Sequence, residues 1–474
     1  VSDALTKASD QLGNDILTAS GNLTLRLMSY LQRESLLDAK SRIQKAKAIR
    51  RSELVWKVMR DTVVQTAVKS WSFVKAIVEF SEKKYQSARE KLGLEQRKTQ
   101  VSPEISDFLA ETQKAISRLP YVYQRLFVLA PLTDENFFRG RNIEINRLTE
   151  AWQNWQAGRY APTVITGETG SGSTSLVNLF CSTQLAGETL YRYEVAKPVC
   201  QEREFLSFMG SLFQTEFTGR EEMLLHFNSL PGRPVIVVEG IHHLFLRTIN
   251  GFAAVKLFAE LMSVTNQNVF WMATANLYGW QYLDKMMHIS DFFGYIIPME
   301  SLSDQEIVEV ILRRHVASGY KLKFELSEGE KVSAKPDRFR HPEEQQQYLK
   351  SMYFKTLNEF ARSNIAISML LWLRSAQDIR GNELTIALPK GLNVSFIKTL
   401  AREKLFFLQA LLVHDGLPED KIAAVLNFSR EKARLLTIQL YDDGIIVIKK
   451  DLYVINPLLY RQVVSTLKSL NLIH

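Results

Sequence analysis

The segment Val164–Phe180, VITGETGSGSTSLVNLF, constrains the fold of this chain more than any other stretch. An apolar run precedes its glycines and a helical pattern follows them, which is the setting of a phosphate-binding loop of the form G-x-x-x-x-G-K-[ST]. Gly167 and Gly172 occupy the glycine positions, and Gly170 lies between them. Glycine lets the backbone approach an anion closely, and a helix begins with free N–H groups, so the segment predicts a phosphate cradle.

One position of the loop departs from this form. Ser173 stands where the lysine is expected, while Thr174 occupies the Mg²⁺-ligand position and Ser175 follows it. A charge-assisted hydrogen bond contributes roughly 1.5–3 kcal/mol, which is about a ten- to hundredfold change in affinity. We therefore expect weakened phosphate binding. Phosphoryl transfer should suffer more, because it depends on positioned cations.

Short apolar runs alternate with helical patterns around this loop. The candidate strands span 162–166, 190–195, 234–240, 269–275 and 294–299. Near-continuous apolar strands are typical of a parallel sheet that is covered on both faces. The alternation predicts an α/β domain of three layers.

These motifs together resemble the AAA+ and STAND superfamily of P-loop ATPases, especially the branch near origin-recognition initiators that ends in a winged helix. The resemblance covers about residues 132–474. NFFRGRNIEINRL is similar to the box that contacts the nucleotide base region, RPVIVVEGIHHLF to the Walker B strand, and VFWMATAN to the sensor 1 strand. The matching residues are Phe138, Gly140, Arg141, Glu144 and Asn276.

The departures from the family pattern concern catalysis. The pair Glu239-Gly240 replaces the Asp-Glu that ends a Walker B strand, and Ala366 stands at the place of the sensor 2 arginine. No arginine lies in 277–293 to serve as a finger. The resemblance thus implies ATP or ADP as ligand, with Thr174 and Glu239 on any Mg²⁺, and with Glu239 and Asn276 as the catalytic candidates. It also leaves open a loop that binds no ligand.

The chain divides into several predicted regions. They are a basic helical domain (1–118), a linker with the base box (119–140), the P-loop α/β core (141–300), a helical lid (301–395) with a polar insertion (327–347), and a winged helix (396–474). In the last region, three helical patterns precede two short strands with a turn at Lys449–Asp451. This order is typical of a winged helix-turn-helix.

The whole basic excess lies in residues 1–100, which hold 19 Lys and Arg against 11 Asp and Glu, while the remainder is balanced at 40 and 40. The candidate contact residues there are Lys45, Lys47, Arg50 and Arg51. A solvated face of a helical bundle, docking on a membrane surface or protein partner, and nucleic-acid binding all remain open. Arg430, Lys432 and Arg434 could meet DNA phosphates or a protein, but acidic residues lie close to them in the sequence.

Composition excludes several classes of protein. Hydrophobic residues make up 46% and charged residues 23%, so collagen-like and disordered chains are excluded. Two cysteines, Cys181 and Cys200, cannot build a disulfide framework, which favours a reducing, cytoplasmic compartment. His242 and His243 fit the end of a strand better than a metal site, because no partner ligands stand at suitable spacing.

The sequence therefore predicts a scaffold or nucleotide-gated switch in a larger protein assembly, without efficient hydrolysis. Two alternatives stay open. One is an active ATPase, completed by residues of partner subunits, that remodels DNA or protein. The other is a DNA-binding, initiator-like protein.

Overall fold

The structure, a computed structural model, describes residues 103–128, 130–132, 137–326, 341–389 and 395–473. Most of the predicted basic helical domain, including Lys45, Lys47, Arg50 and Arg51, lies outside the described residues. Arg118–His474 belong to one compact unit, which contains the phosphate loop and all the sheets described below. Within the described ranges, no helix is long and apolar enough to cross a membrane.

A five-stranded parallel sheet forms the centre of this unit. Its strands are β1 (Thr163–Gly167), β2 (Leu190–Glu194), β3 (Val235–Glu239), β4 (Phe270–Asn276) and β5 (Tyr295–Pro298), in the order β2-β3-β4-β1-β5. Each strand coincides with one of the five apolar runs, and all four pairings are parallel. The predicted α/β core with a parallel sheet is confirmed.

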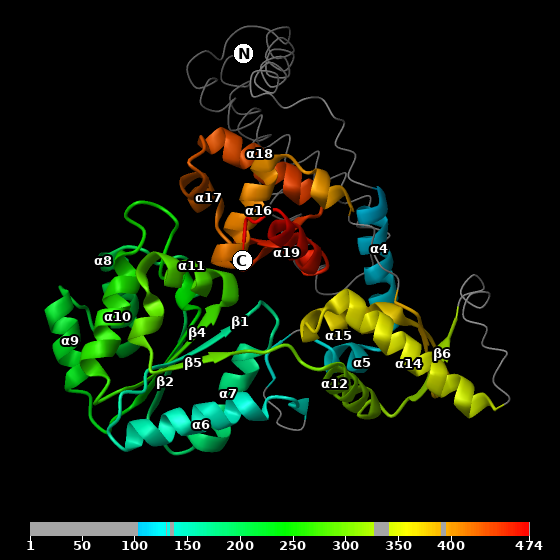
Figure 1. Cartoon of the computed structure of the whole chain (residues 1–474), viewed down its shortest axis with the longest axis horizontal. Helices are drawn as coiled ribbons and strands as arrows, with labels where there is room; N and C mark the ends of the chain where they lie inside the picture. Colours follow the sequence, from blue (N-terminus) through cyan, green and yellow to red (C-terminus); the bar gives the residue numbers. More distant parts are fainter. Residues whose placement is uncertain (1–102, 129, 133–136, 327–340, 390–394, 474) are drawn as a thin grey trace, which may run out of the picture. The chain divides into compact units, whose positions relative to one another are not determined.

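Helices cover both faces of this sheet (Figure 1). One face carries α6 (Asn142–Gln156) and α7 (Ser173–Gln184), and the other carries α8 (Glu202–Phe213), α9 (Arg220–Asn228), α10 (Ala253–Thr265) and α11 (Leu277–Met287). Successive strand residues alternate between the two cores: Ile165 packs with α6 and α7, and Val164 packs on the opposite side. Two dry cores therefore hold the carboxyl ends of the strands in fixed register.

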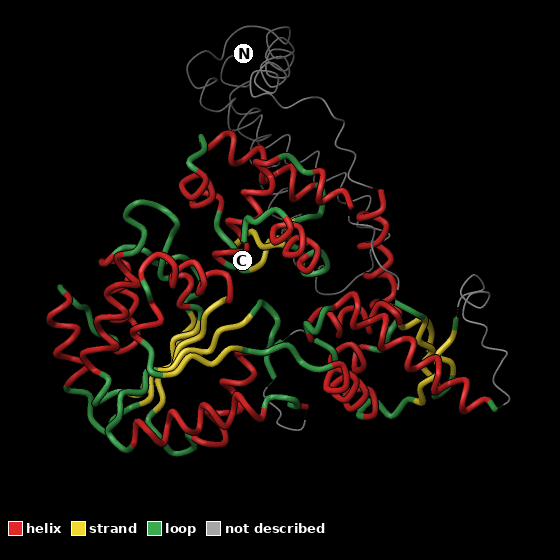
Figure 2. The backbone as a smooth tube through the Cα atoms, in the orientation of Figure 1, coloured by secondary structure: helices red, strands yellow, loops and turns green. Residues whose placement is uncertain are grey.

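The region after β5 contains a sheet that the sequence did not predict. The helices α5 (Tyr121–Leu126), α12 (Asp304–Val316), α14 (Pro342–Ala361) and α15 (Ile365–Ser375) accompany β6 (Lys321–Glu325), β7 (Ala376–Arg380) and β8 (Glu383–Ala387), in the order β6-β8-β7. Figure 2 draws the strands of this three-stranded sheet in yellow. The helix α14 begins at Pro342, inside the predicted polar insertion, whose residues 327–340 are not described. A further helix, α4 (Pro103–Arg118), precedes α5.

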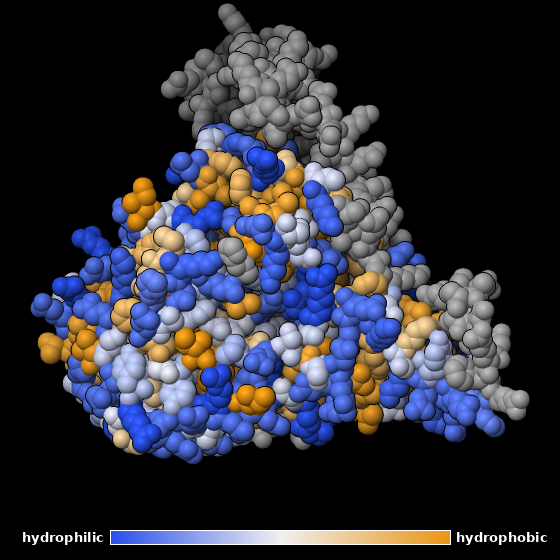
Figure 3. Space-filling model, viewed as in Figure 1, coloured by the Kyte–Doolittle hydropathy of each residue, from blue (hydrophilic) through white to orange (hydrophobic). Residues whose placement is uncertain are grey.

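The C-terminal region has three helices, a ribbon and a closing helix. They are α16 (Arg402–His414), α17 (Glu419–Leu426), α18 (Arg430–Asp442), the antiparallel strands β9 (Ile446–Lys449) and β10 (Leu452–Ile455), and α19 (Tyr460–Ser469). The ribbon turns at Lys450 and Asp451, which have left-handed φ values of 49° and 65°. Hydrophilic residues cover most of the described surface on the face shown in Figure 3, with hydrophobic residues in small groups.

Candidate phosphate site

The phosphate loop joins the end of β1 to the start of α7. Gly170 and Gly172 have φ values of 81° and 95°, in the left-handed region that favours glycine. Gly172 is the N-cap of α7, and no side chain caps this helix end. The N–H groups of the first turn, which begins with Ser173 and Thr174, therefore have no partner within the helix. The predicted phosphate residues thus come together around a half-buried helix N-terminus that no side chain caps.

The loop has no room for a side chain at Gly167 or Gly170. A Cβ on Gly167 would lie 2.4 Å from the Oγ of Ser171, and one on Gly170 would lie 2.7 Å from the Cβ of Ala366. The Ser171 Oγ is buried and makes no hydrogen bond in the protein. A close backbone wrap, an uncapped helix end and an unsatisfied hydroxyl together fit the phosphate groups of a nucleotide.

Arg141 supports the loop from outside. Its guanidinium donates to Glu144 Oε1 at 2.7 Å, to the Glu300 carbonyl at 2.6 Å and to the Ser171 carbonyl at 3.1 Å. The arginine is buried, so its charge is used to hold the backbone. Phe138 packs against the core formed with α6 and α7. Gly140, with φ 75°, lies beside α12, because a Cβ there would meet Glu306 at 2.9 Å.

Side chains from three elements contact Thr169 at the tip of the loop. Asn276 donates from Nδ2 to the Thr169 hydroxyl at 3.1 Å, and that hydroxyl donates to Asp415 Oδ1 at 2.6 Å. Asn364, the N-cap of α15, donates to the Thr169 carbonyl at 3.1 Å. Asn276 also caps α11, since its Oδ1 accepts from the N–H groups of Tyr278 and Gly279. The predicted sensor 1 residue therefore contacts the loop.

The neighbouring residue of the loop, Glu168, forms an ion pair with Arg461 and a hydrogen bond with Tyr278. Arg461 of α19 reaches its Oε2 at 2.6 Å, and the Tyr278 hydroxyl donates to its Oε1 at 2.9 Å. The side chains of Arg461 and Glu168 are only 13% and 15% exposed. Arg461 also donates to the Ala361 carbonyl at the end of α14. The loop tip is thus connected to the junction of α14 and α15 and to the C-terminal region.

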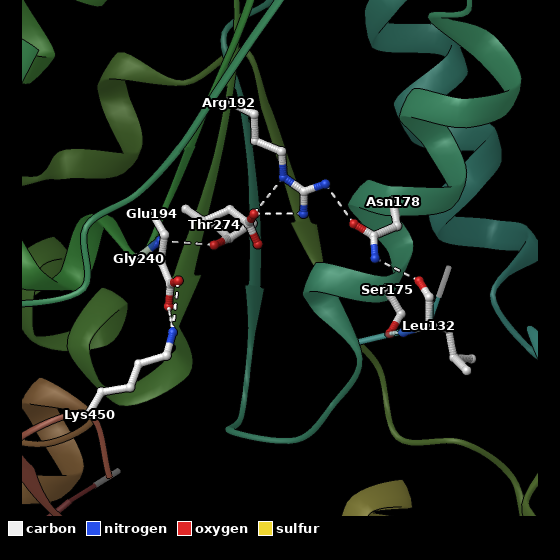
Figure 4. Close-up of polar contacts among 9 residues, drawn as sticks. Leu132, Ser175, Asn178, Arg192, Glu194, Gly240, Thr274 and Lys450 are labelled. Atoms are coloured by element: carbon white, nitrogen blue, oxygen red, sulfur yellow. Dashed lines mark hydrogen bonds and ion pairs between the residues drawn. The ribbon is translucent and has the colours of Figure 1, made fainter. Parts of the chain in front are cut away.

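Glu239, the predicted metal and catalytic residue, is also engaged. Arg192 of β2 contacts Glu239 Oε1 with both its Nε and its Nη2 at 2.7 Å. The Nη1 of the same guanidinium donates to Asn178 Oδ1 at 2.6 Å (Figure 4). Gly240, at the predicted general-base position, has a left-handed φ of 79°, and its N–H donates to the Thr274 hydroxyl.

The segment before the base box is fixed to the same face of α7. The Leu132 N–H donates to the Ser175 hydroxyl at 2.9 Å, and Asn178 Nδ2 donates to the Leu132 carbonyl at 2.6 Å (Figure 4). Asn178 thereby links this segment to Arg192. The hydroxyl of Ser175, a predicted phosphate residue, accepts from Leu132, which leaves its backbone N–H for an anion.

Three buried histidines lie near the carboxyl end of the sheet: His242 and His243 follow β3, and His414 ends α16. The His242 Nδ1 accepts from the Asn276 N–H at 3.0 Å, and its Nε2 lies 3.8 Å from Asp415 Oδ2. The centroid of its ring lies 4.4 Å from that of His243, and the two rings are tilted by 40°. His414 accepts from the Arg247 N–H at 3.4 Å. Burial lowers the pKa of His242, that of His243 to about 4 and that of His414 to about 3. All three are therefore neutral at pH 7.

The basic residues of the C-terminal region pair mostly within the protein. Lys432 pairs with Glu403, Arg434 lies 3.5 Å from Glu419, and Lys450 at the ribbon turn contacts Glu194 at the end of β2 at 2.8 Å. Figure 4 shows this last contact. Arg430 lines an open cavity of about 480 Å³ together with Asp420 and Lys421.

No known protein-family profile matches this chain. No curated protein matches it either. Solved structures do match. The ORC1 protein of Aeropyrum pernix in complex with DNA is 13% identical, with 73% of this chain and 95% of that chain covered and a TM-score of 0.38. The ORC2 protein of the same organism, in ADPNP-ADP complexes, is 13% identical, with 73% and 97% covered and a TM-score of 0.34.

A third similar structure is the RuvB Holliday junction branch migration motor of Thermotoga maritima, 13% identical, with 70% of this chain and 97% of that chain covered and a TM-score of 0.29. At these identities and TM-scores, the likeness adds nothing about function beyond the geometry of the loop.

Sequence reasoning found the loop but missed its side-chain partners. Arg192, Asp415 and Arg461 come from separate elements and belong to no motif. Only Arg192 left a signal, because it is a charged residue between two tyrosines in the middle of a predicted strand. Asp415 and Arg461 could not have been placed at the loop without the fold.

Proposed function

We propose that this protein binds a nucleotide through its phosphates at the loop 167–175, without efficient hydrolysis, and acts as a scaffold or nucleotide-gated switch. The observation that carries the proposal is the uncapped N-terminus of α7 behind two left-handed glycines. Free N–H groups and the helix dipole favour an anion at that point. ATP and ADP supply such an anion and match the resemblance to P-loop ATPases.

Several contacts support the absence of efficient hydrolysis. Ser173 brings no cation to the phosphates, and the Glu239 carboxylate forms an ion pair with Arg192. Gly240 offers no carboxylate to activate water, and Ala366 offers no guanidinium at the lid. Phosphoryl transfer relies on positioned cations and an oriented water, so each change acts on the transition state more than on binding.

The contacts of Thr169 support a switch. This residue bonds to Asn364 of the lid region and to Asp415 of the C-terminal region, which we interpret as a winged helix. A ligand that changes the position of the loop tip would therefore affect both regions. If the ligand binds one arrangement of the two regions more tightly than another, it shifts the equilibrium toward the arrangement that it binds more tightly. The basic N-terminal residues, such as Lys45 and Arg50, are the proposed contact for an acidic protein partner.

The ion pairs of the C-terminal basic residues disfavour the DNA-binding alternative. Lys432 and Arg434 on α18, and Lys450 at the ribbon turn, contact carboxylates of this chain. Phosphate contacts supply most of non-specific DNA affinity, so these pairs would have to open first. An ATPase completed by a partner subunit would need that partner to supply a base and a cation.

The test is nucleotide binding and turnover by the purified chain. We expect ATP and ADP to bind to the wild type and turnover to stay below the typical enzymatic range of about 1–1,000 per second. The substitution Ser173→Lys should tighten ATP binding about ten- to hundredfold, without turnover in that range. Ser182→Lys, at an exposed position near the end of α7, is the matched control and should leave affinity unchanged. Failure of both nucleotides to bind, or fast turnover, contradicts the proposal.

A further inference from the structure

The resemblance to P-loop ATPases implies Mg²⁺, and the residues at the loop allow its fit to be tested. A magnesium ion would take the Thr174 hydroxyl, a carboxylate at the end of β3 and phosphate oxygens. Magnesium requires near-ideal octahedral oxygen ligands and gives up its own waters reluctantly. The carboxylate must therefore be open to the ion or to the waters that surround it.

Glu239 does not meet this requirement. Two donors of Arg192 contact the same oxygen, Oε1, at 2.7 Å. The Glu239 side chain is 11% exposed, so little of it faces solvent. An arginine carries its charge at all accessible pH values, and its planar donors match a carboxylate. A divalent cation at Glu239 would lie beside a fixed positive charge.

The guanidinium is also held on its other side. Its Nη1 donates to Asn178 Oδ1 at 2.6 Å, and Asn178 donates to the carbonyl of Leu132. Movement of Arg192 away from Glu239 would break this chain of hydrogen bonds between β2, α7 and the segment at Leu132 (Figure 4). The residues present thus do not fit Mg²⁺.

We propose that the site binds nucleotide without a divalent cation, and that Arg192 is the residue that excludes the metal by occupying Glu239. This inference rests on the proposed nucleotide binding. Arg192 acts on the ligand through Glu239 and is therefore a positioning residue. Arg192 thus supplies to Glu239 the positive charge that a bound Mg²⁺ would otherwise supply.

The experiment measures the binding of a fluorescent ADP analogue in excess Mg²⁺ and in excess EDTA. The wild type should bind with the same affinity in both buffers. Arg192→Gln removes the charge and frees the carboxylate, so its affinity should become at least about tenfold tighter in Mg²⁺ than in EDTA. Arg192→Gln combined with Glu239→Gln should lose that difference, because no carboxylate remains for the ion.

Two further variants separate charge from folding. Arg192→Lys keeps a cation beside Glu239 and should stay independent of Mg²⁺. Arg233→Gln, at a guanidinium that lies 4.2 Å from the Trp155 ring centroid, is the matched control and should also stay independent. Circular dichroism establishes that each variant is folded, and Mn²⁺ binding followed by electron paramagnetic resonance reports the ion directly. With ADP present, the protein should add no Mn²⁺ site in the wild type and one in Arg192→Gln.

The outcomes are distinguishable. Wild-type binding that needs Mg²⁺, or a protein-bound Mn²⁺ in the wild type, overturns the inference and leaves the proposed function standing. Arg192→Gln that remains indifferent to Mg²⁺ while folded also overturns it. Absence of nucleotide binding in both buffers overturns the proposed function itself.

Discussion

The backbone side and the side-chain side of the phosphate loop differ in what they leave available. On the backbone side, Gly170, Gly172 and the first turn of α7 present N–H groups that no side chain caps. On the side-chain side, the carboxylates of Glu168 and Glu239 are each paired with an arginine. The N–H groups of the backbone side are available to an anion, whereas the carboxylates of the side-chain side are paired with arginines of the same chain.

This difference separates binding from catalysis. Anion binding by backbone groups needs only the loop conformation, which glycine and the helix start supply. Metal binding and water activation need carboxylates with free lone pairs. When arginines such as Arg461 and Arg192 pair with these carboxylates, a loop can keep its ligand and lose its catalytic activity. The first two predictions below each disrupt one side of the loop, and the third concerns the buried histidines next to it.

The largest effect is expected from a side chain in the backbone half. Gly170→Val places a branched side chain at φ 81°, where an added Cβ would lie 2.7 Å from the Cβ of Ala366. The loop must therefore distort, and nucleotide binding should become undetectable. Gly158→Val is the matched control, because it has φ 79° with no atom within 4 Å of its Cβ. Calorimetric titration with ADP measures both. Retained binding by Gly170→Val would show that the cradle is not the site.

In the side-chain half, Arg461→Ala leaves Glu168 charged and largely buried. Removing one partner of a buried ion pair costs about 3–5 kcal/mol. We expect a decrease of that order in the free energy of unfolding, measured by urea denaturation. Lys197→Ala breaks an exposed pair with Asp451, with side chains 61% and 86% exposed, and should change stability by less than about 1 kcal/mol. Equal effects of the two variants would contradict the importance of burial.

The smallest effect of a single residue is the dependence of stability on pH that comes from buried His243. An unfolded histidine binds a proton near pH 6.5, whereas burial lowers the pKa of His243 to about 4, so the unfolded state binds more protons between these values. Stability should be complete above pH 6.5 and fall as the pH drops toward 4, by roughly 3 kcal/mol for this residue. Thermal unfolding across this range measures the loss.

Neighbouring groups modify this profile. His414 adds to the loss, because burial lowers its pKa to about 3, and His242 acts in the same direction. Burial raises the pKa of Asp415, which opposes the trend below neutral pH. Lys450 and Glu194 face His243, and Arg247 faces His414. His414→Gln should reduce the slope, and a flat profile for the wild type would contradict the prediction.

The central sheet and the loop were predictable, and the small sheet and the ion pairs were not. A segment such as PVIVVEG is a short apolar run rich in Val and Ile and bounded by Pro and Gly, which favours a strand buried on both faces. β6 (KLKFE) and β8 (ELTIA) are short and mixed in polarity, and their pairing depends on contacts far along the chain. Glycine spacing reveals a loop conformation, but a pair such as Arg192 and Glu239 exists only once β2 and β3 lie side by side.

The ion pair of Arg192 and Glu239 also has a consequence for descent. Loss of either residue alone leaves a single charge in a largely enclosed place, so selection should remove such intermediates more readily than a joint replacement. Among related chains, positions 192 and 239 should therefore change together, for instance to two neutral side chains. Position 173, which balances no partner, should drift on its own.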